Sequence, residues 1–272
     1  HVTGVQTCAL PILALKNVDY VVHAAALKQV NTAEYNPSEY IKTNIIGAEN
    51  IIKASINNNV KKIIALSTDK ASNPINLYGA TKLVSDKLFS SANNIVGNKK
   101  IAFSIVRYGN VINSRGSVIP YFKDLIKKNK KFFPITDKEM TRFLITLEEA
   151  VNFVLYSFKI MKGGEIIITK IPAMKITDLA NILNKSYSQK IIGIRPGEKI
   201  HEQMSSSDES RNILEFKKYF IICPTIEMNI KKNFKISKNG EIGKKVKNNF
   251  TLSSNNFLIK NKTNPIFKKI IL

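Results

Sequence analysis

Short apolar runs alternate with helix-like segments along most of this chain, and this alternation limits the fold more than any other feature. The runs are continuous rather than alternating in polarity, which is typical of strands buried on both faces. They lie at residues 18–25, 62–67, 101–106 and 165–168. Apolar residues at helical spacing predict helices over 36–52 and 78–89. The sequence therefore predicts an α/β fold with a doubly wound parallel sheet.

Polar residues follow the first three predicted strands at their carboxyl ends. His23 and three alanines end the first, Ser-Thr-Asp-Lys at 67–70 ends the second, and Arg-Tyr-Gly-Asn at 107–110 ends the third. Doubly wound sheets bind ligands beyond the carboxyl ends of their strands. We therefore expect these three segments to meet in one binding site.

Tyr78 and Lys82 are four residues apart, which places both side chains on one face of a helix. A phenol has a reference pKa of about 10, and a neighbouring ammonium group favours the phenolate. The pair could serve as a proton acceptor in alcohol oxidation, or it could be an ordinary solvated pair. Its position one loop after residues 67–70 favours the catalytic interpretation.

The net charge of +22 raises the possibility of nucleic-acid binding. However, only five of the 42 basic residues are arginine, and the chain is also rich in Asn and Ile, which is the bias of an AT-rich genome. We therefore predict no nucleic-acid partner. The two cysteines and three histidines have no metal-ligand spacing, and no apolar run approaches the roughly 20 residues that cross a bilayer. These features predict no metal, no membrane segment in the part present, and a reduced, cytoplasmic setting.

Residues 1–12 resemble the in-frame translation of a common sequencing adapter, so we expect them to be foreign to the protein. The alternative is a native strand with Gly4 in a phosphate-binding loop. We expect residues 13–170 to form the cofactor-binding domain and 171–224, with parts of 110–145, a smaller lobe. The Lys/Asn-rich tail at 225–272 is expected to be loosely packed or to form a peripheral extension.

A set of motifs resembles the extended short-chain dehydrogenase/reductase superfamily and, within it, the C5-inverting UDP-N-acetylglucosamine 4,6-dehydratases. The matching segments are residues 23–28, 41–44, 65–82, 106–111, 114–118, 140–143 and 194–199. The resemblance implies a Rossmann-like sheet lacking its first strands, a smaller substrate-binding lobe, NADP as cofactor and UDP-N-acetylglucosamine as substrate. It also implies a homo-oligomer and a first step toward pseudaminic acid on flagellin or surface glycans.

The resemblance also implies roles for the residues after the second strand. Tyr78, supported by Lys82, would take the proton of the sugar 4-hydroxyl, which Thr68 would orient. Related sugar-modifying enzymes carry Asp-Glu where this chain has Asp69 and Lys70. Lys70 is implied as the base at C5 and Asp69 as the acid for the departing 6-hydroxyl. We expect burial and Lys82 to depress the pKa of Lys70, with Asp69 opposing them; a surface ion pair is the plainer alternative.

Further residues of the matched motifs are candidates for ligand binding. Arg107 follows a strand and fits the role of a structural anchor as well as that of a binding residue, so it is left out of the candidates. No Gly-x-x-Gly-x-x-Gly precedes residue 18, where the family would bind the cofactor pyrophosphate, so we expect the natural gene to continue upstream. The cofactor candidates are Ala24, Lys28 and Val111 with Tyr78 and Lys82, and the substrate candidates are Asn110, Arg115, Arg142, Arg195 and Glu198.

Three other functions remain open from the sequence. A C5-retaining 4,6-dehydratase and a nucleotide-sugar 4-epimerase share the fold and the redox pair. A basic binding protein without catalysis belongs to a different class and would bind nucleic acid with a steep salt dependence. Turnover of UDP-N-acetylglucosamine and the geometry of the product at C5 would separate these functions.

Overall fold

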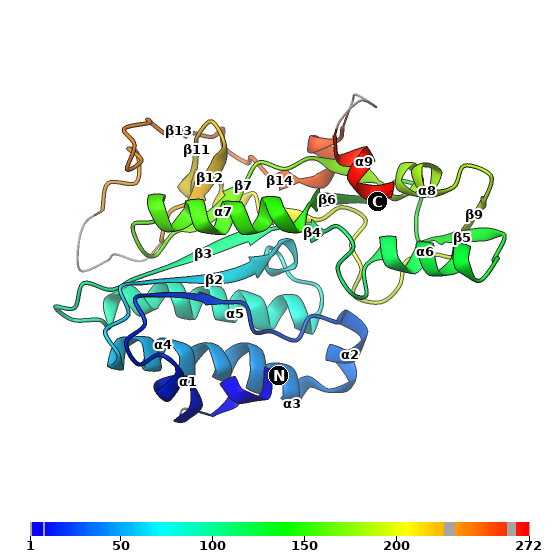
Figure 1. The fold of residues 1–272 in the computed structure, drawn as a ribbon. Helices are drawn as coiled ribbons and strands as arrows, with labels where there is room; N and C mark the ends of the chain where they lie inside the picture. Colours follow the sequence, from blue (N-terminus) through cyan, green and yellow to red (C-terminus); the bar gives the residue numbers. More distant parts are fainter. Residues whose placement is uncertain (1, 8, 226–231, 260–264, 272) are drawn as a thin grey trace.

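A seven-stranded sheet forms the centre of the computed structural model, which describes residues 2–7, 9–225, 232–259 and 265–271. In sheet order its strands are β1 (Tyr20–His23), β2 (Lys62–Thr68), β3 (Ala102–Tyr108), β7 (Ile166–Thr169), β12 (Tyr219–Ile222), β11 (Ile213–Glu215) and β13 (Lys244–Lys245). The first four strands are parallel, and the last three continue the sheet in antiparallel pairing. Helices cover both faces: α4 (Gly47–Asn57) and α5 (Leu77–Ser91) lie on one, and α7 (Leu147–Ile160) lies on the other (Figure 1).

This arrangement confirms the predicted α/β fold with a mostly parallel sheet. The interior of β2 and β3 is mostly apolar because both faces are covered, and Ile63, Ile105 and Val106 have no exposed surface. The predicted helix over 36–52 is a helical run in three parts: α3 (Pro37–Tyr40), the π-helix η2 (Ile41–Ile46) and α4. It follows the short α2 (Val30–Tyr35).

Asn44 lies in the π-helical part and fixes the loop after β1. Its amide donates to the carbonyl of Leu27 (2.9 Å) and accepts from the Leu27 N–H (2.8 Å), while Nδ2 also lies 3.0 Å from the Thr81 hydroxyl on α5. The Asn44 side chain is buried, so these bonds satisfy polar groups that water cannot reach. Asn44 thereby joins the loop after β1 to helix α5.

The first residues are helical. Gly4 lies in the 3₁₀-helix η1 (Val2–Gln6), and α1 (Ala9–Ala14) follows it and packs against α4. The alternative of a native strand with Gly4 in a phosphate-binding loop is therefore wrong. Within the described residues, β1 forms one edge of the sheet.

A smaller lobe stands beside the carboxyl ends of the parallel strands (Figure 1, right). Its core includes stacked rings, with Phe133 at 4.5 Å from Phe122 and 4.9 Å from Tyr187 between ring centres. Its elements are α6 (Val118–Lys127), β5 (Phe132–Ile135), α8 (Ile176–Leu183), β9 (Ser188–Ile191) and α9 (Ile266–Ile271).

Short strands and turns connect the lobe to the large sheet. They form a three-stranded sheet, β4 (Asn110–Val111), β6 (Thr141–Ile145) and β8 (Ala173–Lys175), and a pair, β10 (Gln203–Ser205) with β14 (Leu252–Ser253). The 3₁₀ turns η3 (Asp69–Ala71), η5 (Asp208–Asn212) and η6 (Ser254–Phe257) lie in connecting segments, whereas η4 (Ala92–Asn94) follows α5 and contacts β3.

Parts of the tail are built into the core, which differs from the expected loose extension. Leu252 in β14 is 3% exposed, and Ile270 in α9 has no exposed surface. Residues 226–231 and 260–264 of the tail lie outside the described residues. The few apolar residues of this Lys/Asn-rich segment find buried positions that a local pattern could not show.

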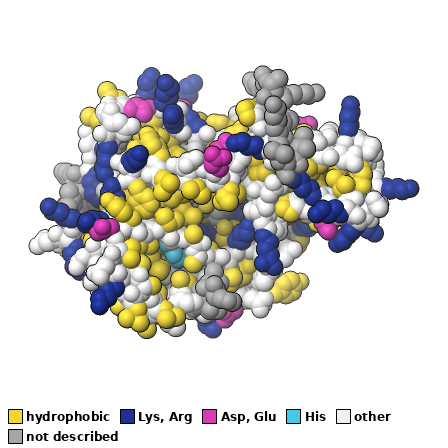
Figure 2. Space-filling view, viewed as in Figure 1, with side chains coloured by type: hydrophobic (Ala, Val, Ile, Leu, Met, Phe, Trp, Pro, Cys, Tyr) yellow, Lys and Arg dark blue, Asp and Glu magenta, His cyan; other side chains and the backbone are white. Residues whose placement is uncertain are grey.

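The face shown in Figure 2 carries its basic residues in a dispersed pattern. Lys and Arg side chains stand apart around the face seen in Figure 2 rather than forming a single stripe. None of the helices in the described ranges combines the length and apolar character needed to cross a bilayer. The same ranges hold no cluster of three or more His, Cys, Asp or Glu side chains suited to a metal ion.

Candidate active site

The turn after β2 carries the predicted catalytic residues. Thr68 ends the strand, and its hydroxyl donates to Asp69 Oδ1 at 2.9 Å and accepts from the Lys70 N–H at 3.4 Å. Asp69 has no exposed surface. The next helix, α5, begins after Asn76, whose side chain accepts from the N–H of Gly79 at 2.8 Å and so caps the helix. The turn and the first residues of α5 are therefore held against each other.

Gly79 permits this close packing. A Cβ atom at this position would lie 2.2 Å from the Lys70 carbonyl oxygen and 3.0 Å from Cβ of Pro74. Since a backbone oxygen cannot yield as a flexible side chain can, any larger residue must displace the turn or the helix. The glycine next to Tyr78 is therefore required by the approach of α5 to Lys70.

We expect Gly79→Ala to lower the free energy of unfolding by about 1–3 kcal/mol and to displace Lys70. Thermal and chemical denaturation would measure the stability, and turnover would report the displacement. Val84→Ala, at an exposed position of the same helix, is the matched control. A Gly79→Ala protein as stable as the control would show that the turn adapts without cost.

Lys70 lies between two carboxylates. Its Nζ is 3.1 Å from Asp69 Oδ1 and 3.1 Å from Glu202 Oε1, and its side chain is 21% exposed while both carboxylates are almost completely buried. Arg142 Nε lies 3.7 Å from the same Glu202 oxygen. The plainer alternative of a surface ion pair is therefore wrong, because this charge cluster is buried.

The sequence prediction missed Glu202. It follows the matched segment 194–199 by three residues, but it is 132 positions from Lys70 along the chain. A lone glutamate in a polar segment gives no local signal, and only the fold brings it to the end of β2.

The expected direction of the Lys70 pKa was wrong. Burial lowers this pKa, but the negative charges of Asp69 and Glu202 outweigh burial and raise it above the usual value for lysine. Lys82 was expected to help lower the pKa of Lys70. The positive charge that lowers it is instead that of Arg142. The ammonium form of Lys70 is therefore favoured at this position.

The two carboxylates differ in their own proton affinity. Burial raises the pKa of Asp69, although the charge of Lys70 opposes this rise. Burial also acts on Glu202, but Lys70 and Arg142 outweigh it and lower the pKa of that carboxyl. Asp69 is thus the carboxyl of the two that holds a proton more readily, and Glu202 is the more firmly ionised.

Tyr78 and Lys82 share one face of α5 as predicted, but Lys82 does not act on the phenol in the expected way. Burial raises the pKa of Tyr78 to about 12, and the main opposing influences are the charge of Lys70 and a hydrogen bond with Thr68. Lys82 Nζ instead donates to the carbonyl of Leu66 at 2.7 Å, and burial lowers its pKa. The cation that favours the phenolate is therefore Lys70.

The predicted substrate residues fall into separate groups. Arg142 joins the cluster around Glu202, and its NH1 donates to the carbonyls of Thr141 (2.8 Å) and Ile200 (3.1 Å). Arg195 and Glu198 pair with each other at 3.0 Å on a loop where the Arg195 side chain is 53% exposed.

The remaining two substrate candidates lie on the segment that leads into the smaller lobe. Asn110 begins β4, and its buried Oδ1 has no hydrogen-bond partner among the described residues. Arg115 is exposed between β4 and α6, and in the described part of the chain it forms no ion pair with the other candidates.

The substrate-candidate loop is fastened to the catalytic turn. Asn76 Nδ2 donates to the Gly197 carbonyl at 2.8 Å, and Lys199 Nζ donates to the Ser72 carbonyl at 2.8 Å. Arg195 and Glu198 are therefore carried by a loop whose position depends on the cap of α5.

Residues suited to one half of a nicotinamide cofactor are present. Ala24 follows β1 at its carboxyl end, and Lys28 is close enough to the cluster for the charge of Lys70, together with burial, to lower its pKa. Val111 is half-buried in β4. These three positions are the ones that would contact the cofactor at the carboxyl ends of the strands. The pyrophosphate side does not fit, because the described residues before β1 are helical and hold no glycine-rich loop.

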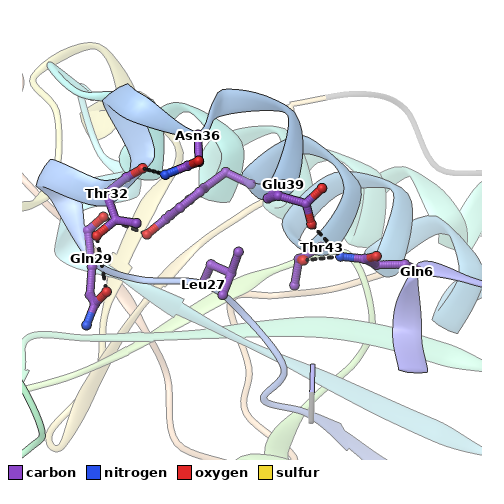
Figure 3. A pocket seen from close by; sticks show the side chains of 8 residues that line it. Gln6, Leu27, Gln29, Thr32, Asn36, Glu39 and Thr43 are labelled. Atoms are coloured by element: carbon purple, nitrogen blue, oxygen red, sulfur yellow. Dashed lines mark hydrogen bonds between the residues drawn. The ribbon is translucent and has the colours of Figure 1, made fainter. Parts of the chain in front are cut away.

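A hollow of about 260 Å³ lies near the loop after β1 and is separate from the catalytic residues. Figure 3 shows its polar walls, in which Gln6 donates to Thr43 (2.9 Å) and to Glu39 (3.3 Å). Its lining residues are Gln6, Leu27, Gln29, Thr32, Asn36, Glu39, Tyr40 and Thr43. None of them belongs to the charge cluster, so this hollow does not define the active site.

Together, the doubly wound sheet, the Tyr78–Lys82 pair on α5 and the polar turn after β2 define an extended short-chain dehydrogenase/reductase. Known structures agree: "Pen" from Bacillus thuringiensis superposes with a TM-score of 0.86 at 36% identity, covering 98% of this chain and 81% of that one. The dTDP-glucose 4,6-dehydratase DesIV from Streptomyces venezuelae, with NAD bound, shares the fold at a TM-score of 0.65 and 19% identity, over 72% of this chain and 67% of that one.

Sequence comparison identifies the family within this superfamily. Residues 5–224 match the family model described as "Polysaccharide biosynthesis protein". A Campylobacter jejuni protein named UDP-N-acetylglucosamine 4,6-dehydratase (inverting) is 60% identical over 89% of this chain and 73% of its own length. A Rickettsia bellii protein named UDP-glucose 4-epimerase is 46% identical over 77% of this chain and 62% of its own length. This chain belongs to the family of inverting UDP-N-acetylglucosamine 4,6-dehydratases, which are hydro-lyases.

Proposed function

We propose that this chain dehydrates UDP-N-acetylglucosamine to a UDP-4-keto-6-deoxy-hexosamine with inversion at C5, using NADP. The main supporting observation is that Asp69 and Lys70 lie beside Tyr78 at the end of β2. The 60% identity to the Campylobacter dehydratase supports the same function. A lysine at this position supplies a different base from the glutamate of related enzymes. When bound, NADP supplies the oxidant for C4 and the hydride for C6.

The residues of the chain divide the proton transfers between them. Thr68 orients the 4-hydroxyl, and Tyr78 accepts its proton while Lys70 and Thr68 favour the phenolate. The C4 ketone then acidifies the C5 proton, which Lys70 removes after losing its own proton to solvent. C5 regains a proton on its opposite face when C6 has been reduced, which gives the inverted product. Asp69, whose pKa is raised by burial, donates a proton to the departing 6-hydroxyl. Lys82 holds the end of β2 through the Leu66 carbonyl.

Substrate binding is proposed for the arginines around this centre. Arg142 is already fixed beside the cluster, whereas Arg195 is exposed and can meet a diphosphate with a planar, bidentate fork. Arg115 lies on the exposed segment before α6. Glu198 and Asn110 are proposed as hydrogen-bonding partners of the nucleotide sugar.

The test is to incubate the full chain with NADP and UDP-N-acetylglucosamine in deuterated water and to follow the products by NMR. We expect a 4-keto-6-deoxy sugar that carries solvent deuterium at C5 and is inverted there. A product that keeps its C5 configuration would indicate the retaining reaction instead. Formation of the C4 epimer without loss of water would indicate an epimerase, the activity named for the Rickettsia relative.

A further inference from the structure

Glu202 is the one carboxylate of the charge cluster that comes from outside the turn after β2. Its side chain is 3% exposed, and Oε1 lies 3.1 Å from Lys70 Nζ on a different segment from Asp69. The second oxygen, Oε2, is buried and has no hydrogen-bond partner among the described residues. A buried carboxylate is costly unless a cation compensates it, and Lys70 is the nearest such group.

The backbone of Glu202 is held by the tail of the chain. Its N–H donates to the Ser254 hydroxyl at 3.0 Å, and its carbonyl accepts from the Ser254 N–H at 2.8 Å. The Ser254 hydroxyl is also 2.6 Å from that of Thr141. Since β14, directly before Ser254, pairs with β10, directly after Glu202, the position of this carboxylate is fixed from both sides.

Other charged and titratable groups face Lys70 from each element around it. Asp69 in η3 and Glu202 before β10 contribute negative charge, and Tyr78 on α5 adds to them when ionised. Arg142 on β6 acts in the opposite sense. Lys28 and Lys199 also interact with the charge of Lys70. Burial raises the pKa of Asp69, whereas the pKa of Glu202 is lowered, so Glu202 is the more firmly ionised carboxylate. Glu202 therefore remains the counter-ion of Lys70 when Asp69 is protonated.

We propose that Glu202 is a positioning residue for Lys70: its buried carboxylate holds the ammonium group at the end of β2 from a distance of 3.1 Å. The functional consequence rests on the proposed role of Lys70 as the C5 base. Lys70 must lose its proton before it can remove another, so Glu202 sets the pH range in which the elimination runs.

Trace acetylation of the full chain tests the proposal without substrate or cofactor, because only the neutral amine reacts. The reaction with a trace of acetic anhydride is measured at several pH values, and labelling of Lys70 is quantified by mass spectrometry relative to the exposed Lys217. Removing an adjacent opposite charge lowers a lysine pKa by about 1–3 units. We therefore expect Glu202→Gln to raise the relative labelling of Lys70 by about tenfold or more near neutral pH.

Two variants separate charge from packing. Glu202→Asp keeps the negative charge on a shorter side chain and should label much less than Glu202→Gln. Glu215→Gln removes a carboxylate that pairs with Lys170 at 2.6 Å outside the site, and should label as the wild type does. An unchanged rate in Glu202→Gln would overturn the proposal, and so would equal increases in Glu202→Gln and Glu202→Asp, which would indicate loosened packing.

The pH dependence of turnover provides the functional readout. In Glu202→Gln, the rise of solvent-deuterium incorporation at C5 should move to lower pH by about 1–3 units, with little change in KM. A profile that does not move, in a protein whose Lys70 labelling has increased, would show that the base at C5 is not Lys70. That result would refute the proposed catalytic role while leaving the positioning of Lys70 by Glu202 intact.

Discussion

Lys70→Ala is expected to abolish loss of water from UDP-N-acetylglucosamine while oxidation at C4 remains measurable. Removing a general base costs about 10²–10⁴ in rate, and no other amine occupies the space between Asp69 and Glu202 among the described residues. Oxidation should be slower as well, because Lys70 is the cation that opposes the rise of the Tyr78 pKa. Solvent deuterium should not enter C5.

The measurement is a pair of assays on one protein sample: reduction of NADP for the first step, and NMR of the sugar for the elimination. Lys217→Ala, at an exposed position, should behave as the wild type in both. Full dehydratase activity in Lys70→Ala would exclude Lys70 as the C5 base. Loss of both steps with an unchanged melting temperature would show that Lys70 is needed already for oxidation.

Arg107→Met is expected to cause the largest loss of stability. Arg107 and Asp86 are buried in β3 and α5, with NH2 3.0 Å from Asp86 Oδ2, and Asp86 also accepts from the Ser67 hydroxyl at 2.7 Å. NH1 donates to the Met204 carbonyl at 2.7 Å. Removing the arginine leaves a buried carboxylate without its cation, which costs about 3–5 kcal/mol.

Chemical denaturation would measure this loss, with Arg211→Met at an exposed position as the control. Adding Asp86→Leu to Arg107→Met should restore part of the stability, because the uncompensated charge is then absent. A single variant as stable as the control would mean that the buried Asp86 carboxylate does not depend on Arg107. Arg107 is thus a structural anchor, as one of the two sequence interpretations held.

The fold could be predicted from the sequence because its signals are local. The continuous apolar runs at 62–67 and 101–106 correspond to β2 and β3, and the stripe from Tyr78 to Phe89 corresponds to α5. Burial on both faces leaves no alternation in such strands, so the pattern itself indicates a covered sheet. The tail gave no comparable signal, although β14 and α9 are built into the core.

The site was predicted only in part. Motif spacing placed Thr68, Asp69 and Lys70 together with Tyr78, because a strand end and the next helix are joined by a short loop. It also suggested that Lys82 would act on the phenol, but i and i+4 spacing specifies a shared helix face and not the partner of the side chain. Lys82 donates to Leu66 at 2.7 Å instead.

The sequence by itself determined the α/β fold, the composition of the turn after β2 and the family, since each motif and each apolar run is a pattern of residues close together in the chain. The tertiary structure decided the charge state of that turn. The pKa of Lys70 depends on Glu202, 132 residues further along, and on the tail that holds Glu202 through Ser254. Electrostatic energy depends on distance in space and on burial, and neither can be read from position along the chain.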